Sequence, residues 1–136
     1  MAALTAVSRE VPVYPPTRTE KGGTSQLKAD IVIEHGTPNH REFFIIELKC
    51  EGLYNRPAFV RAVQGDVAKL DGDIQNNFKP AKLWAFAIST SQETYDHMLG
   101  WRPDAEKVFL EPDEDVMVLY DRPKIVLWIL EKEVTR

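Results

Sequence analysis

Two acids and a lysine stand at the ends of two apolar segments, in a spacing that suits metal chemistry. Asp30 directly precedes Ile31–Ile33, and Glu47 and Lys49 closely follow Phe43–Ile46. Carboxylate oxygens are ligands that Mg²⁺ takes from proteins, and a neighbouring ammonium group stabilises negative charge that develops in a reaction. The three side chains therefore predict a divalent-cation site with a lysine beside it.

The two apolar segments are predicted to pair as a β-hairpin. Residues 35–40 between them form a cluster of turn-forming residues, longer than a two-residue hairpin loop. In an antiparallel pair the start of the first strand lies beside the end of the second, so Asp30 comes close to Glu47 and Lys49. Side chains alternate along a strand, so Glu47 and Lys49 share a face that Leu48 does not. Because both segments are almost continuously apolar, we expect a sheet covered on both faces.

A helix and a third strand are predicted after the hairpin. Apolar residues recur at helical spacing on one face, at Phe59, Val63, Val67, Leu70 and Ile74. Asn55 suits the N-cap and Pro57 the first turn, and we expect the helix to end at about Asn76 or Asn77. Residues 81–89 are predicted to form a buried strand. A strand, a helix and a strand in this order form a right-handed crossover between parallel strands.

Asp30, with Glu47-Leu48-Lys49 at the end of an apolar strand, resembles the motif of the PD-(D/E)xK nucleases, the restriction-endonuclease-like fold. The resemblance covers about residues 27–90, and Ala29 stands where the motif has a proline before the acid. It implies an α/β fold in which a mixed central β-sheet is flanked by helices, here followed by a C-terminal β extension. It also implies a Mg²⁺ (or Mn²⁺) cofactor.

The resemblance assigns a role to each residue of the site. Asp30 and Glu47 would be metal ligands, and the backbone carbonyl of Leu48 would be a further ligand. Lys49 would position water or stabilise the pentacovalent phosphate. Gln64 matches an auxiliary polar residue that reaches the active site from the following helix, although a solvent-facing glutamine has the same appearance in the sequence.

The whole chain, residues 1–136, is expected to form a single domain. Residues 1–26 are predicted to be an extended N-terminal arm, because three prolines within 11–16 favour extended backbone. Three interpretations of this arm stay open: an edge strand, a contact with a partner, or the end of a helix from a longer parent protein. Many PD-(D/E)xK members carry a further acid on an upstream helix. That helix is not recognisable here, and Glu10 and Glu20, the upstream acids, are expected on the surface.

Residues 91–136 are predicted to form one helix and three strands. Ser89–Ser91 offers a cap for a helix over Gln92–Leu99. The strands are expected at Lys107–Leu110, Val116–Tyr120 and Lys124–Leu130, either as an extension of the sheet or as a small second one. Every residue over 126–130 is apolar, so the last strand is covered on both sides or lies in a subunit interface.

Composition narrows the class of protein. The formal net charge is −4, from 17 basic and 21 acidic residues, which does not favour tight, nonspecific binding to nucleic acid. No apolar segment approaches the length of a membrane span, and we recognise no secretory signal. The single Cys50 fits a reducing compartment, so an intracellular location, cytoplasmic or nuclear, is expected. Cys50 and the three histidines do not form a zinc pattern.

Two functions follow as expectations. The first is a Mg²⁺-dependent nuclease that hydrolyses phosphodiester bonds of nucleic acid, with DNA favoured over RNA as the partner. The alternative is a catalytically inactive nuclease-fold domain that serves as a protein-binding or homodimerisation module. The acidic net charge, the missing upstream helix and the all-apolar last strand favour the alternative.

Overall fold

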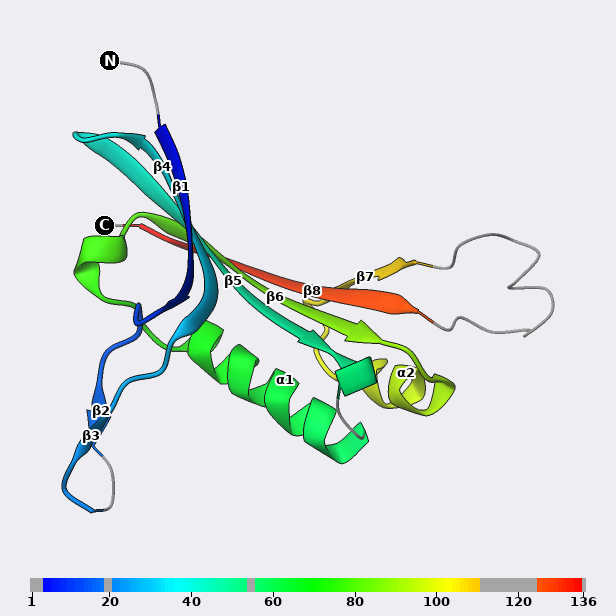
Figure 1. Ribbon diagram of the computed structural model, residues 1–136. Helices are drawn as coiled ribbons and strands as arrows, with labels where there is room; N and C mark the ends of the chain where they lie inside the picture. The colour runs from blue at the N-terminus through cyan, green and yellow to red at the C-terminus, as the bar shows by residue number, and fades with distance from the viewer. Residues whose placement is uncertain (1–3, 19–20, 54–55, 111–124, 136) are drawn as a thin grey trace. The chain divides into compact units, whose positions relative to one another are not determined.

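Six of the eight strands among the described residues form one mixed sheet, accompanied by two α-helices (Figure 1). The computed structural model describes residues 4–18, 21–53, 56–110 and 125–135. The strand order in the sheet is β1-β4-β5-β6-β8-β7, and β2 and β3 form a separate two-stranded ribbon. The predicted α/β class with a mixed sheet is therefore confirmed. The strands are β1 Leu4–Val11, β2 Thr17–Arg18, β3 Thr24–Ser25, β4 Ala29–Thr37, β5 His40–Cys50, β6 Ala81–Ser89, β7 Glu106–Phe109 and β8 Val126–Val134.

The predicted hairpin is β4 with β5. The two strands pair antiparallel, with Ile31 opposite Ile46. Asp30 and Glu47 are each one residue beyond that pair, so the register sets the two acids opposite each other. The expected cover on both faces is met on one face only. Phe43, Ile45 and Glu47 are buried, whereas the residues between them, 44 and 46, are partly exposed.

Helix α1 (Arg56–Asp71) is the predicted crossover element between β5 and β6. The arrowheads of these two strands point the same way in Figure 1, as a crossover requires. The predicted end at Asn76 or Asn77 is wrong, because the helix stops at Asp71 and Asn76–Phe78 forms a separate 3₁₀ turn. Gly72, a poor helix former, directly follows this end, and Lys132 Nζ donates to the carbonyl oxygens of Leu70 at 2.7 Å and Gly72 at 2.9 Å. The predicted cap, Asn55, lies outside the described residues.

The chain divides into two compact units. One comprises Met1–Glu47, Ala68–Trp84 and Glu131–Arg136, and the other comprises Leu48–Val67 and Ala85–Leu130. Neither α-helix in the part of the chain that the structure describes is long and apolar enough to cross a membrane.

The first unit contains the hairpin and the N-terminal strand. β1 pairs antiparallel with β4 and is the edge strand of the sheet, so the edge-strand interpretation of the N-terminal arm holds for residues 4–11. Two aromatic pairs pack against the strands of this unit. The ring centroids of Phe43 and Phe78 lie 5.4 Å apart in an edge-on arrangement, and those of Phe44 and Trp84 lie 5.8 Å apart in a stacked one. The buried apolar residues of the first unit include Val13, Tyr14, Ala29, Val32, Phe43, Ile45, Leu70, Ile74, Ala81 and Leu83.

The second unit contains α2 (Gln92–Met98) and the β7–β8 pair. Ser91 caps α2 as predicted, because its hydroxyl accepts from the backbone N–H of Thr94 at 3.2 Å. On β8, Val126, Trp128 and Leu130 are buried, and the buried indole N–H of Trp128 donates to Ser89 Oγ at 2.9 Å. The strand predicted at residues 116–120 lies outside the described residues.

Candidate metal centre

Two ion pairs connect one face of β5 to α1. In the first unit, Lys69 Nζ of α1 lies 3.4 Å from Glu47 Oε2 of β5. In the second unit, Lys49 Nζ of β5 lies 3.1 Å from Asp66 Oδ2 of α1. Glu47 and Lys49 are alternate residues of a strand, and Asp66 and Lys69 are three apart on a helix, so each pair of residues shares a face. Glu47 and Lys49 were predicted to share a face of the strand, and both pair with side chains of the same helix, α1.

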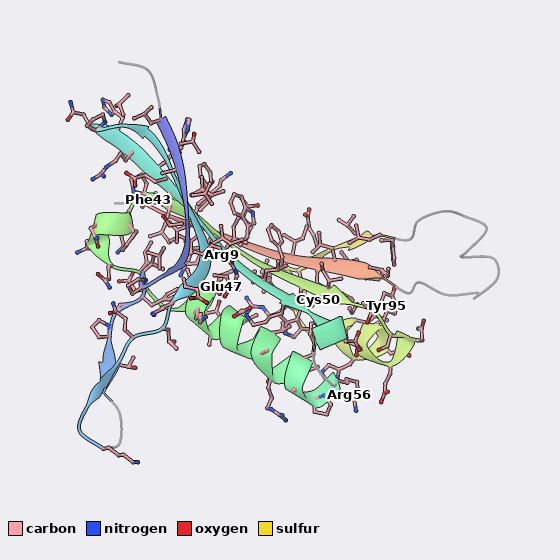
Figure 2. The ribbon with its side chains drawn as sticks, viewed as in Figure 1. Arg9, Phe43, Glu47, Cys50, Arg56 and Tyr95 are labelled. Atoms are coloured by element: carbon pink, nitrogen blue, oxygen red, sulfur yellow. The ribbon has the colours of Figure 1, made fainter. Side chains whose placement is uncertain are left out.

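Glu47, labelled in Figure 2, is completely buried, and each of its carboxylate oxygens has a partner. The Tyr14 hydroxyl donates to Oε1 at 2.6 Å, and the Lys69 ammonium lies against Oε2. The same ammonium donates to the Lys28 carbonyl oxygen at 3.1 Å and lies 5.7 Å from the centre of the Tyr14 ring. A buried carboxylate needs such partners, because it has lost its hydration.

Tyr14 is itself held in place. It is 3% exposed, and its backbone carbonyl accepts from the side-chain amides of Gln26 and Gln75, both at 3.1 Å. The backbone N–H of Gln75 also donates to the Val13 carbonyl at 2.8 Å. The backbone that carries the phenol facing Glu47 is therefore held by Gln26 and by Gln75, in the turn after α1.

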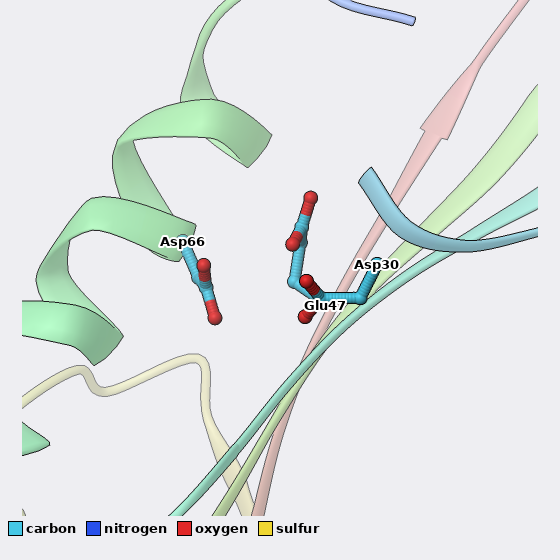
Figure 3. Close-up of side chains that lie close together, drawn as sticks. All are labelled: Asp30, Glu47 and Asp66. Atoms are coloured by element: carbon cyan, nitrogen blue, oxygen red, sulfur yellow. The ribbon is translucent and has the colours of Figure 1, made fainter. Parts of the chain in front are cut away.

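Asp30, Glu47 and Asp66 each offer one carboxylate oxygen, and these three atoms lie within 4.8 Å of one another (Figure 3). Asp30 comes from β4, Glu47 from β5 and Asp66 from α1. The donor set consists of oxygen atoms alone, which suits Mg²⁺ or Mn²⁺ rather than a metal that prefers sulfur or imidazole. The residues present therefore fit a hard divalent cation.

The residues predicted from the sequence differ in where the structure places them. Asp30 and Glu47 are brought together across the hairpin, and Lys49 is paired with an acid. The Leu48 side chain is 44% exposed, and its carbonyl oxygen accepts from Lys49 Nζ at 3.4 Å. Gln64 is exposed on α1, and its auxiliary role stays a prediction.

Sequence reasoning missed Asp66, Lys69 and Tyr14 as members of this group. Asp66 had a recognisable signal, because it lies three residues after Val63 and four before Leu70, inside the apolar stripe of the helix. An acid at such a position is buried unless the helix turns away, and a buried acid needs a partner. Tyr14 had no comparable signal, since its contact with Glu47 joins residues 33 apart.

A third buried acid, Glu51, directly follows the hairpin, and its partners differ from those of Glu47 and Asp66. Burial raises the pKa of Glu51, but hydrogen bonds from Ser91, Thr94 and Thr90 outweigh burial and leave the pKa below its ordinary value. Its carboxylate accepts from the Ser91 hydroxyl at 2.7 Å and from the Ser91 backbone N–H at 3.0 Å. These bonds fix the start of α2, so Glu51 serves the fold.

Comparisons of this chain with protein-family models, with curated proteins and with solved structures find no match.

Proposed function

We propose that this chain is a Mg²⁺-dependent nuclease with a restriction-endonuclease-like core, which hydrolyses phosphodiester bonds of nucleic acid. The observation that supports it best is the group of three carboxylates, Asp30, Glu47 and Asp66, with Lys49 paired to one of them. Like charges this close repel one another, and a divalent cation removes that repulsion. Two of these acids were expected from the sequence motif alone.

Each residue has a role in this proposal. Asp30, Glu47 and Asp66 would hold the cation, which when bound supplies positive charge beside the phosphate. Lys49, 16% exposed, would orient water or stabilise negative charge on the phosphate. Tyr14 and Lys69 orient the Glu47 carboxylate, because each contacts one of its two oxygens.

A second candidate is the catalytically inactive protein-binding or dimerisation module. The ion pairs favour it, since Lys69 already neutralises Glu47 and Lys49 already neutralises Asp66. Buried pairs of this kind can stand in place of a metal. The two candidates therefore differ in whether a cation binds in competition with the two lysines.

Calorimetric titration with Mn²⁺ tests the proposal on wild type and on Asp30→Asn and Glu47→Gln, which keep the side-chain shape. Glu34→Gln is the matched control, because Glu34 is also an acid of the hairpin but pairs with Arg41 at the exposed end. We expect wild type and the control to bind Mn²⁺ equally, and the two site variants to lose at least about tenfold in affinity, or about 1.4 kcal/mol.

Cleavage of duplex and single-stranded nucleic acid in Mg²⁺ completes the test. We expect Asp30→Asn and Lys49→Ala to abolish cleavage while the urea unfolding midpoint shows a folded protein. Full activity of either purified variant would sink the assignment. A wild type that neither binds Mn²⁺ nor cleaves any substrate would favour the inactive module.

A further inference from the structure

A two-stranded ribbon, β2 with β3, leaves the core beside the candidate metal centre. β2 pairs antiparallel with β3, with Thr17 opposite Ser25, and in Figure 1 the two strands extend away from β1 and β4. The side chains that the structure describes over residues 15–28 are all exposed. The residues on either side of this segment, Tyr14 and Ala29, are buried. The ribbon therefore lies between two anchored points, and none of the side chains described within it belongs to the core.

The ribbon carries a charge opposite in sign to that of the whole chain. Residues 15–28 contain three basic residues, Arg18, Lys21 and Lys28, and one acid, Glu20, whereas the chain as a whole is acidic. Lys21 and Lys28 have exposed side chains. Gly22, between the strands, has φ +83°, which a glycine adopts without strain. A basic segment on an acidic protein attracts a partner that carries many negative charges.

Both ends of the ribbon are attached to the candidate site within the first unit. Tyr14, just before it, donates to Glu47, and the Lys28 carbonyl at its end accepts from Lys69, which pairs with the same Glu47. Asp30 follows Lys28 by two residues. A polyanion that lies along the ribbon is thereby led to the carboxylates.

We propose that this ribbon binds B-form duplex DNA, with Lys21 and Lys28 against the phosphates; the inference rests on the proposed function and names its substrate class. The major groove of B-DNA, about 12 Å wide, admits a two-stranded β-ribbon. The major groove of A-form RNA is deep and narrow, so a ribbon cannot enter it. Exposed lysines supply sequence-independent phosphate contacts, whose strength falls as salt rises.

Fluorescence anisotropy with a labelled 24-base-pair DNA duplex tests this, in EDTA and in the Asp30→Asn background so that binding is measured without cleavage. The test variant is Lys21→Ala with Lys28→Ala. The matched control removes two positive charges elsewhere in the first unit, by Arg9→Ala on β1 with Lys82→Ala on β6. Arg9, Lys21 and Lys28 are exposed and the Lys82 side chain is 41% exposed, so the urea unfolding midpoints should agree.

The slope of log K against log salt is negative, and removal of two phosphate contacts should make it less negative by about 1.8. The same change should raise Kd at 100 mM salt about tenfold or more. The control should keep the wild-type slope, and an RNA duplex of the same sequence should bind more weakly than DNA. Equal slopes for the two double variants, equal affinity for RNA, or no salt-dependent binding by the Asp30→Asn background would each overturn the inference. Ribbon-dependent DNA binding by a protein that never cleaves DNA would support it while the proposed activity fails.

Discussion

Lys69→Met is the perturbation that asks most directly what balances the buried charge of Glu47. Methionine keeps the length and apolar stem of lysine but removes the ammonium that lies 3.4 Å from Glu47 Oε2. Glu47 is completely buried, so water cannot replace the lost cation unless the site opens. We therefore expect the variant to be destabilised when no divalent cation is present.

The expected magnitude follows from the burial of the pair. Removing one partner of a buried ion pair costs about 3–5 kcal/mol. Because the Lys69 side chain is 16% exposed and the Tyr14 hydroxyl stays on Oε1, we expect a smaller loss, about 2–3 kcal/mol. For a chain of this size that corresponds to a fall in Tm of about 6–15 °C.

Urea unfolding in EDTA measures the loss of stability without a cation, and urea unfolding in Mn²⁺ measures how much of that stability a bound cation restores. A cation held by the carboxylates replaces the missing charge, so Mn²⁺ should stabilise Lys69→Met more than wild type. A ligand at 100 times its Kd adds about 2.7 kcal/mol. Lys79→Met is the control, since its partner Asp73 is 68% exposed and such pairs contribute about 0–1 kcal/mol. Equal unfolding midpoints for the two variants in EDTA would refute the reasoning, as would an equal response of wild type and Lys69→Met to Mn²⁺.

Two further predictions concern the supporting structure. The pKa of Glu51 is lowered from its ordinary 4.5, so its ionised carboxylate stabilises the fold above that pH and loses this effect as pH falls through the folded value. The stability difference between wild type and Glu51→Gln, from urea unfolding at several pH values, should be largest near neutrality and shrink below pH 4.5; a pH-independent difference would contradict this. Gly36→Ala should unfold at a much lower Tm than Gly22→Ala. Both glycines have positive φ, but a Cβ at Gly36 would lie 2.0 Å from the His40 carbonyl oxygen, whereas nothing lies within 4 Å of one at Gly22. Equal Tm values would show that the turn after β4 relaxes.

The hairpin and the third strand could be predicted because their signals are local. β-branched and aromatic runs bounded by turn residues define β4, β5 and β6, and the acids at their ends follow from the antiparallel register. The predicted end of α1 failed although a local signal was present, because Gly72, a poor helix former, directly follows Asp71. Ile74 continues the helical spacing and is buried, which favoured a longer helix. The bonds from Lys132 to the carbonyls at the helix end, by contrast, join residues about 60 apart and have no signal within the helix.

The candidate site was predictable only where its residues lie next to a strand pattern. Asp30 and Glu47 do, whereas Tyr14 and Lys69 meet Glu47 through contacts between distant parts of the chain. Asp66 was not predicted because it interrupts an apolar stripe, which indicates a helix face and does not by itself indicate a site. β1 had no alternation signal and was only one of three interpretations of the N-terminal arm, since residues 4–10 are exposed on both faces of the strand and burial imposes no alternation on them.

The position of β8 has a consequence for how the chain folds as it is synthesised. β8 is the last strand in the sequence, yet it lies inside the sheet between β6 and β7. Until β8 has been synthesised, β6 presents an open edge and β7 lacks the strand with which it pairs. Open edges recruit other chains, so this is the interval in which a nascent protein is most exposed to misassembly. Arrival of β8 closes the edge, brings Lys132 to the end of α1, and makes completion of the sheet a late step of folding.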